Sequence, residues 1–424
     1  MKKYFLLLPL TFLFINCSST KVELRKVNLA DTNITSDEYT FKDFVTSFRM
    51  FHPEESYNLA ETETQKLAAK ALEYVAQNRY ENAAETFVKA MTEKDSLELL
   101  WCYFPRWYYT HITHNWEKLE EYENIRNGIT DSSFIFYKDK PKFDIEFVED
   151  SVVIPIKFKN GVPFIKIKIN GKYYYFIIDT GLDKTLLGKN IATKNNVVYD
   201  SKEDTIKGID GTATTFSGVL SKLDLGQIKI SNFPIYVINR NDAIKAKFLF
   251  ITFFQSDGII GWDLLQNFDF TIDYKNKQLI LRKPIEKNIE RRNLFWYKVP
   301  IVKFYSENNY PLLFFFDSGS SLSYFNPQII SLILGIDTNK LKKSSQRLHG
   351  VNEFVKMRFY KYPDFQCYTI AADGINYLSA NKILLQDIWS ENSSINLDGK
   401  LGSDWFKDKA IRFDMLNGIF EILE

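Results

Sequence analysis

Two apolar runs, each ending in an aspartate, a small hydroxyl residue and a glycine, constrain the fold of this chain more than any other feature. Tyr173–Leu187 reads YYYFIIDTGLDKTLL and contains Asp179; Pro311–Tyr324 reads PLLFFFDSGSSLSY and contains Asp317. Each run of aromatic and β-branched residues predicts a buried strand, and the glycine after it permits a sharp turn. Apolar neighbours at the end of a buried strand can perturb the pKa of a carboxyl group. A single motif of this kind also occurs in ordinary turns at strand ends, so the prediction depends on its repetition.

Further landmarks recur in the same order after each aspartate. The matched segments are Gly261-Trp262-Asp263 with Gly402-Ser403-Asp404, Phe270–Asp273 with Ile411–Asp414, and Gly208–Gly211 with the region of His349-Gly350. The offset within each pair is close to about 140 residues, which indicates an internal duplication. The sequence therefore predicts two similar lobes, over residues 150–285 and 295–424.

Alternating apolar and polar residues from Val152 onward predict that these lobes are mostly β. Asn170-Gly171, a strong hairpin signal, precedes the strand that ends at Asp179. Ile206–Gly218 is rich in glycine and small hydroxyl residues and predicts a mobile hairpin, which contains Gly208 and Gly211. The predicted fold class is mostly β, with two duplicated lobes that follow a small α-helical domain.

The chain is long enough for two or three domains and is apolar enough to fold. It has 424 residues, of which 45% are hydrophobic and 16% aromatic, and this composition argues against disorder. The formal net charge is only +1, so charge gives no reason to expect nucleic acid or an anionic membrane surface as a partner.

The N-terminus has the pattern of a targeting segment. Lys2 and Lys3 precede the apolar run Tyr4–Ile15, which is too short to span a bilayer permanently, and Cys17 follows. This arrangement resembles a bacterial lipoprotein signal. The resemblance implies a signal peptide over residues 1–17, acylation of Cys17, and a cell-envelope location that is periplasmic or surface-exposed. The alternative is an ordinary secretory peptide ending near a cysteine. Residues 18–40 are polar and predict a tether.

Residues 41–135 predict a helical domain. Apolar residues recur at helical spacing across Gln65–Met91, and the polar Gln77-Asn78-Arg79 divides them into two antiparallel helices. The alternation of large and small side chains over residues 65–98 resembles one tetratricopeptide unit. Two interpretations stay open: a helical domain that packs against the rest of the chain, or a surface that binds a protein partner.

The duplicated motifs resemble those of the aspartic proteases, as a pepsin-like pair of lobes built from retropepsin-like β-barrel units. The resemblance covers about residues 152–424. It implies that Asp179 and Asp317 form a catalytic dyad sharing one proton. It also implies roles for the residues beside them: Thr180 and Ser318 lock the two loops together, Gly181 and Gly319 approach the carboxylates, and Gly208 and Gly211 belong to a flap over the substrate. The family's second motif matches Ile259-Ile260-Gly261 and Lys400-Leu401-Gly402; the lysine is a departure that we attribute to solvent exposure.

The two aspartates are not expected to be equivalent. Ser320 follows Gly319 and carries a hydroxyl that could donate to Asp317, whereas Leu182 at the matching place cannot donate. Hydrogen bonds to a carboxylate stabilise its charged form. We therefore hypothesise that Asp317 ionises more readily and that Asp179 carries the proton.

These inferences lead to a cell-envelope aspartic endopeptidase. It would use no metal and no cofactor, bind an extended peptide or protein substrate, and attach to the membrane through a lipid at Cys17. The alternative is a non-catalytic peptide-binding or scaffold lipoprotein with the protease fold. The motifs of metallohydrolases and serine hydrolases are missing from the sequence. His111 and His114 share a predicted helix face but lack a metal-site signature, and we expect no disulfide between Cys102 and Cys367.

Overall fold

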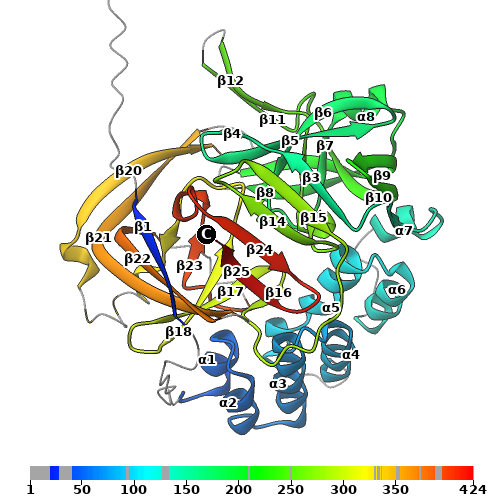
Figure 1. Ribbon diagram of the computed structural model, residues 1–424. Helices are drawn as coiled ribbons and strands as arrows, with labels where there is room; N and C mark the ends of the chain where they lie inside the picture. The colour runs from blue at the N-terminus through cyan, green and yellow to red at the C-terminus, as the bar shows by residue number, and fades with distance from the viewer. Residues whose placement is uncertain are drawn as a thin grey trace, which may run out of the picture.

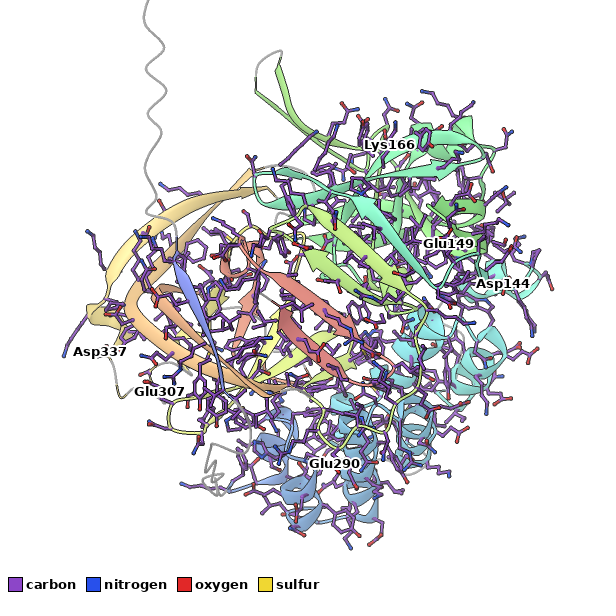
Figure 2. The ribbon with its side chains drawn as sticks, viewed as in Figure 1. Asp144, Glu149, Lys166, Glu290, Glu307 and Asp337 are labelled. Atoms are coloured by element: carbon purple, nitrogen blue, oxygen red, sulfur yellow. The ribbon has the colours of Figure 1, made fainter. Side chains whose placement is uncertain are left out.

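The computed structural model describes residues 20–27, 41–91, 95–126, 133–208, 211–248, 251–328, 331, 335, 337–349, 354–371, 374–386 and 394–423. The helices between residues 44 and 125 gather at the bottom and lower right of Figure 1, and two β lobes lie above them on either side of a central sheet. The predicted fold class, mostly β with two lobes after a helical region, is confirmed. Charged side chains labelled in Figure 2 lie on the outer surface: Asp144, Glu149, Lys166, Glu290, Glu307 and Asp337.

The helical layer precedes most of the β structure. Its elements are α1 (Phe44–Arg49), α2 (Pro53–Asn58), α3 (Glu63–Ala76), α4 (Tyr80–Ala90), α5 (Tyr103–Trp107), α6 (Trp116–Ile125) and α7 (Ser133–Lys138), with a 3₁₀ turn at Glu98–Leu100 and a π-helical turn at Tyr108–Ile112. The Thr62 side chain accepts a hydrogen bond from the Gln65 amide and caps the start of α3. The predicted break between α3 and α4 is confirmed, and Asn78 turns the chain there with a φ of 58°.

The helices pack against the second lobe through polar and aromatic contacts. Asn78 Nδ2 donates to the carbonyl oxygens of Leu294 (3.2 Å) and Met415 (3.1 Å). The amide of Trp296 donates to Tyr80 Oη at 3.0 Å, and the Phe51 and Phe295 rings stack 4.1 Å apart. These contacts join the α3–α4 turn, the start of α4 and the Phe51 ring to the second lobe.

Each lobe contains a sheet of the same topology. The first consists of β2 (Asp144–Phe147), β4 (Lys157–Lys159), β5 (Val162–Ile169), β6 (Lys172–Ile178), β7 (Leu186–Gly188), β8 (Val198–Gly208), β9 (Gly211–Leu225), β10 (Ile228–Ile238) and β13 (Gly258–Ile260). The second consists of β1 (Val22–Val27), β16 (Leu294–Tyr297), β17 (Val299–Ser306), β18 (Pro311–Phe316), β19 (Tyr324–Phe325), β20 (Lys342–His349), β21 (Phe354–Ala371), β22 (Gly374–Leu385) and β23 (Gly399–Leu401).

The strand orders are β2-β10-β7-β13-β6-β5-β9-β8 and β1-β22-β19-β23-β18-β17-β21-β20. Every strand of the first order has a counterpart at the same place in the second, and β4 and β16 pair with β5 and β17 in the same way. This one-to-one correspondence confirms the predicted duplication. The remaining elements outside the central sheet are α8 (Lys189–Lys194), the hairpin of β11 (Ile244–Phe248) and β12 (Ile251–Ser256), α9 (Trp262–Leu265), and 3₁₀ turns at Thr338–Lys340 and Ser403–Trp405.

A five-stranded sheet joins the two lobes. Its order is β25 (Ile419–Leu423), β24 (Ala410–Asp414), β14 (Asp269–Asp273), β15 (Gln278–Arg282) and β3 (Ser151–Pro155). The duplicated strands β14 and β24 pair antiparallel at its centre, with Phe270 opposite Phe413 and their rings stacked 4.9 Å apart. The axis relating the lobes therefore passes through this pair, and one apolar core runs through the helices and both lobes.

The hairpin predicted at Asn170-Gly171 is confirmed. The two residues have φ of 46° and 81°, and Ile169 pairs with Lys172 across the turn. Positive φ at both central residues matches the twist of the flanking strands, which sets the register of β6 and so the position of Asp179.

The N-terminal segment holds a strand that the sequence analysis did not predict. Residues 22–27, inside the segment predicted as a tether, form β1 and pair antiparallel with β22, with Val22 opposite Ala380 and Val27 opposite Ile375. The structure describes no helix long and apolar enough to cross a bilayer. Cys102 and Cys367 are both buried free thiols.

Candidate active site

Both motif aspartates lie directly after a central strand of their lobe. The strand β6 ends at Ile178 and β18 ends at Phe316, one residue before Asp179 and Asp317 respectively. Behind each loop a short strand runs parallel to the delivering strand: β13 beside β6 and β23 beside β18. The Asp179 amide donates to the Ile260 carbonyl at 3.0 Å, and the Asp317 amide donates to the Leu401 carbonyl at 2.9 Å. The two aspartates are therefore held by equivalent backbone contacts.

Thr180 and Ser318 tie the two loops together through reciprocal hydrogen bonds. The Thr180 amide donates to Ser318 Oγ and the Ser318 amide donates to Thr180 Oγ1, each at 3.0 Å. Each hydroxyl in turn donates across the lobe boundary at 2.8 Å, Thr180 to the Phe316 carbonyl and Ser318 to the Ile178 carbonyl. Both side chains are fully buried, so each bond is costly to break. This set of four bonds fixes the positions of the two carboxyl groups relative to each other.

The structure brings Asp179 and Asp317 together, with each glycine against the other lobe's carboxyl group. A Cβ on Gly181 would lie 2.8 Å from Asp317 Cγ, and one on Gly319 would lie 2.4 Å from Asp179 Cγ. Both positions therefore exclude a side chain. The Gly181 amide also donates to Asp179 Oδ1 at 2.9 Å.

The site raises the pKa of Asp179 well above its usual value. Burial is the largest cause, and the neighbouring Asp317 adds to it as a like charge and as a hydrogen-bond partner. The Gly181 amide and the Lys400 ammonium act in the opposite direction but are outweighed. The balance of these effects favours the protonated form of Asp179.

Lys400 is buried beside Asp317, so its attribution to solvent exposure is wrong. Its Nζ lies 2.8 Å from Asp317 Oδ2 and 4.9 Å from the centre of the Tyr324 ring. Burial alone would lower the pKa of Lys400, but the electrostatic effects of Asp317 and Tyr324, together with the hydrogen bond to Asp317, outweigh it and hold the pKa above its ordinary value. The reason for the error is that a buried lysine is normally unfavourable and becomes stable only through such a partner.

Ser320 does not play the part that the sequence suggested. Its hydroxyl donates to the Leu322 carbonyl at 3.0 Å and accepts from the Leu322 amide, closing a local turn within its own loop. The side chain that contacts the Asp317 carboxyl group is therefore Lys400, not Ser320. The raised pKa of Asp179 fits its predicted part as the proton carrier, and the largest cause of that shift is burial.

A second pair of matched contacts supports the site, and the sequence analysis missed it. Thr185 Oγ1 donates to Asp263 Oδ1 at 2.8 Å, and Ser323 Oγ donates to Asp404 Oδ1 at 2.6 Å. Each hydroxyl also accepts from the amide of the glycine before that aspartate. Burial raises the pKa of Asp263 to about 7 and that of Asp404 to about 6. The signal was present, because Thr185 and Ser323 occupy the same place after Asp179 and Asp317.

The remaining predicted site residues lie farther along the chain. Gly208 and Gly211 pair with each other at the end of the β8–β9 hairpin, and the second lobe has the equivalent hairpin β20–β21. Cys17 lies outside the described residues. His114 is buried, its Nδ1 lies 2.9 Å from the Thr110 carbonyl, and burial lowers the pKa of this histidine. No group of three metal-ligating side chains occurs among the described residues.

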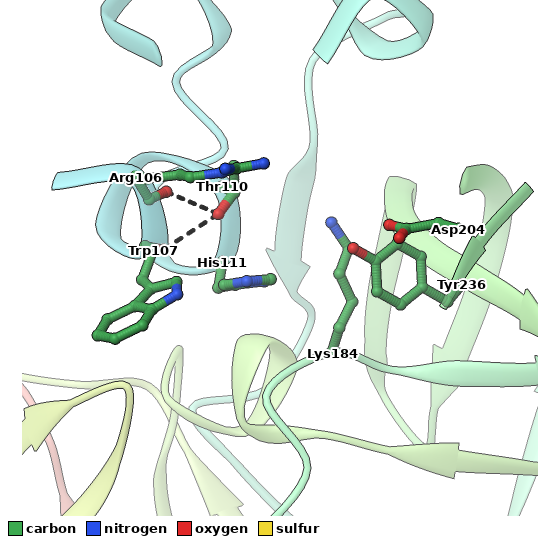
Figure 3. A pocket seen from close by; sticks show the side chains of 7 residues that line it. All are labelled: Arg106, Trp107, Thr110, His111, Lys184, Asp204 and Tyr236. Carbon is green, nitrogen blue, oxygen red and sulfur yellow. Dashed lines mark hydrogen bonds between the residues drawn. The ribbon is translucent and has the colours of Figure 1, made fainter. Parts of the chain in front are cut away.

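A separate cavity of about 180 Å³ lies between the helical layer and the first lobe. In Figure 3, Arg106, Thr110 and His111 face Lys184 and Tyr236 across it. The residues lining it are Arg106, Trp107, Thr110, His111, Lys184, Asp204 and Tyr236, and none of them is a predicted site residue.

Comparison with known proteins gives one family match. A search of curated proteins found no similar sequence. The family model for aspartyl proteases matches residues 165–264, which begin within β5 and end within α9. The matched segment contains Asp179, Thr180 and Gly181, the hairpin of Gly208 and Gly211, and Gly261. The first lobe is therefore similar in sequence to aspartyl proteases, and the second lobe repeats its topology.

Proposed function

We propose that this protein is an aspartic endopeptidase that hydrolyses peptide bonds with a water activated between Asp179 and Asp317. The observation that carries the proposal is the crossed arrangement of the two loops, in which each carboxyl group lies against the other lobe's glycine. Two carboxyl groups in such proximity hold one proton between them, which supplies a general base and a general acid at once. The match of residues 165–264 to aspartyl proteases supports the same reaction.

The chemistry follows from the unequal protonation of the pair. The Asp317 carboxylate removes a proton from the water, whose oxygen bonds to the carbon of the scissile carbonyl. The proton on Asp179 passes to the carbonyl oxygen, which gives a tetrahedral diol. When the carbon–nitrogen bond breaks, the proton that Asp317 took from the water passes to the leaving nitrogen, and a hydroxyl of the diol returns a proton to Asp179. The products are a carboxylic acid and an amine, and the pair is again singly protonated. No metal or organic cofactor takes part in this sequence.

The substrate class that fits is an extended peptide. Sheet proteins bind such segments by strand-like hydrogen bonds, with alternate side chains setting specificity. The paired hairpins β8–β9 and β20–β21 are our candidates for the segments that cover it, with Gly208 and Gly211 near the tip of the first.

A non-catalytic scaffold is the second candidate, and the site favours the enzyme. Both carboxyl groups, both glycines and all four bonds of Thr180 and Ser318 are present. A protein that uses only the shape of the fold has no need of two carboxyl groups held against each other, because burying them together is costly. We propose that the helical layer supports the second lobe, since the α3–α4 turn, the start of α4 and the Phe51 ring all contact β16.

We also propose that the protein is anchored in a bacterial cell envelope by a lipid on Cys17. The supporting pattern is the short apolar run before that cysteine. Incorporation of a labelled fatty acid into the wild type, and its loss in Cys17→Ser, would support the anchor; equal labelling of the two would contradict it.

The enzymatic proposal is tested by digesting a peptide library with the purified protein. The wild type is expected to cleave, and pepstatin is expected to inhibit. Asp179→Asn and Asp317→Asn should each lower kcat/KM by roughly 10²- to 10⁴-fold, the range for loss of a general acid or base. Asp257→Asn, which alters a half-buried carboxyl group bonded to the Tyr175 amide in the same lobe, is the matched control and should cleave normally. Cleavage that survives both dyad substitutions would remove the assignment.

A further inference from the structure

We propose that Lys400 is a fixed counter-ion of the aspartate pair, which keeps Asp317 ionised, leaves the shared proton on Asp179 and thereby assigns their roles as base and acid. This inference rests on the proposed function for its mechanistic part. Its electrostatic part is independent of catalysis, because it concerns which carboxyl group is charged in the folded protein. Lys400 acts through Asp317 and is a positioning residue in this sense.

The ion pair is short and largely removed from solvent. Lys400 Nζ lies 2.8 Å from Asp317 Oδ2, and the two side chains are 10% and 16% exposed. The other oxygen, Oδ1, lies against Gly181. A close opposite charge favours the ionised carboxylate, and in a buried site this effect is only weakly screened.

The backbone around Lys400 holds the ammonium in place. Strand β23 lies between β18 and β19, with Lys400 opposite Phe315 on one side and Tyr324 on the other. The Tyr324 ring also contacts the ammonium, at 4.9 Å from its centre. A lysine on a central strand, with its head group against a ring and a carboxylate, cannot turn out to solvent without breaking both contacts.

The first lobe lacks this cation at the matching position. Strand β13 is the counterpart of β23, and its Ile259 pairs with Ile177 and Leu186 as Lys400 pairs with Phe315 and Tyr324. Ile259 is buried in an apolar cluster with Phe164. This matched position therefore carries a buried cation in the second lobe and an apolar side chain in the first.

Counting the charges around the pair supports the assignment. The titratable groups near Lys400 and Asp317 are Asp179 from the first lobe, Tyr324 from β19, and Tyr274. Tyr274 interacts electrostatically with both Asp317 and Asp404. With Asp179 protonated, Asp317 ionised and Lys400 charged, the three central groups sum to zero. Zero net charge is the least costly state for a buried site. A pair without the lysine would carry one negative charge in the same surroundings.

The assignment has a consequence for the pH profile. A positive charge favours the deprotonated state of both aspartates, so Lys400 lowers the pH at which the pair takes up its second proton and the pH at which it loses its last one. Because burial and Asp317 raise the pKa of Asp179, the singly protonated state still persists above the usual acid range of a carboxyl group. The lysine thus shifts the working range toward lower pH. It also makes Asp317 a weaker base, which limits the rate of proton removal.

The test compares Lys400→Met, of nearly the same length, with wild type in two measurements. A ¹³C NMR titration of the aspartate carboxyl groups reports ionisation without any catalysis, and kcat/KM against pH reports the working range. Lys400→Met is expected to raise both apparent pKa values of the pair by about 1 to 3 units, the effect of an adjacent opposite charge. Lys409→Met removes another buried lysine, which bonds to Val22 and Asp408, and should leave both pKa values unchanged. Lys400→Arg keeps the positive charge, so both apparent pKa values of the pair should stay close to those of wild type.

The outcomes separate this inference from the proposed function. Unchanged carboxyl titrations in folded Lys400→Met would overturn the counter-ion. If Lys400→Met shifts the carboxyl titrations but the wild-type protein cleaves no peptide, the counter-ion is supported and the endopeptidase is contradicted. If Lys400→Met does not fold, the wild-type titration decides: as the pH falls, Asp179 must take up the first proton, and first protonation of Asp317 would overturn the proposal.

Discussion

Gly319 lies so close to the Asp179 carboxyl group that a Cβ on it would be 2.4 Å from Cγ. The neighbour is a carboxyl group at the centre of the site, held by the Gly181 amide, so it cannot move aside freely. Gly319→Ala is therefore expected to displace Asp179 and abolish cleavage. Overpacking of this kind should cost about 1–3 kcal/mol of unfolding free energy.

The control for this glycine is Gly171→Ala, in the hairpin that precedes β6. Nothing lies within 4 Å of a Cβ there, although its φ of 81° carries a conformational cost. It should destabilise the protein while leaving kcat/KM nearly unchanged. Normal activity in folded Gly319→Ala, measured beside that control, would contradict the geometry of the pair.

The interlocked hydroxyls Thr180 and Ser318 should be coupled in stability. Thr180→Val keeps the shape of the side chain but leaves the Ser318 amide and the Phe316 carbonyl without this partner. Each such loss in a buried site costs about 1–3 kcal/mol. Ser318→Ala should cost a similar amount, and urea unfolding of the double variant should show less than the sum, because both sets of bonds join the same two loops and loss of one set already loosens the other.

Thr193→Val is the matched control for that cycle. Its hydroxyl donates to the Lys189 carbonyl on the exposed side of α8, so removing it should change stability by less than about 0.5 kcal/mol. Strict additivity of Thr180→Val and Ser318→Ala would indicate that the two loops are not tied to each other.

The protein should lose stability as the pH rises from about 4 toward 7. Burial raises the pKa of Asp263 and of Asp398 to about 7, and that of Asp404 to about 6. A carboxyl group with a raised pKa in the folded state stabilises fully below its unfolded pKa, near 4, and that stabilisation is lost as the pH climbs through the folded value. Urea midpoints should therefore be higher at pH 5 than at pH 8.

Asp398→Asn is the variant that isolates one of these groups. One Asp398 oxygen accepts from the Leu313 amide at 2.6 Å, and the asparagine oxygen can replace it. The pH dependence should shrink by an amount on the order of a few kcal/mol, because one pKa unit corresponds to about 1.4 kcal/mol. Asp257→Asn alters the equivalent, half-buried contact of the first lobe and serves as control. An equal pH dependence in wild type and Asp398→Asn would show that this carboxyl group is already ionised in the fold.

Sequence patterns were sufficient for the elements that local rules determine. The apolar runs before Asp179 and Asp317 form central strands, the positive φ values at Asn170-Gly171 follow from residue type, and the repeated landmarks correspond to repeated topology. These features depend on spacing and on turn chemistry, both of which can be read from a single chain.

Three features of the structure depend on contacts that spacing does not reveal. From the sequence, we attributed Lys400 to a solvent-exposed position, because a buried lysine is rare unless it is paired. Its partner Asp317 directly follows another strand, β18, and only the parallel pairing of β18 with β23 brings the two residues together. Likewise, nothing local indicates that residues 22–27 pair with β22. Ser320 was assigned by adjacency alone, and its hydroxyl instead satisfies the Leu322 backbone.

Tyr80 should couple the helical layer to the second lobe in one cooperative unit. Its hydroxyl accepts from the Trp296 amide at 3.0 Å and from Asn78 at 2.8 Å, and burial raises the pKa of this tyrosine well above its usual value. Tyr80→Phe leaves the amide without this acceptor and should lower the unfolding free energy by about 1–3 kcal/mol. Because the helices share one core with both lobes, helical circular dichroism and tryptophan fluorescence should still report a single transition.

Tyr57→Phe, on an exposed ring, is the control for Tyr80→Phe. Since Tyr80 is not among the residues that form the aspartate site, kcat/KM at low temperature should stay at the wild-type value; a helical transition well below that of the lobes would instead indicate an independent domain.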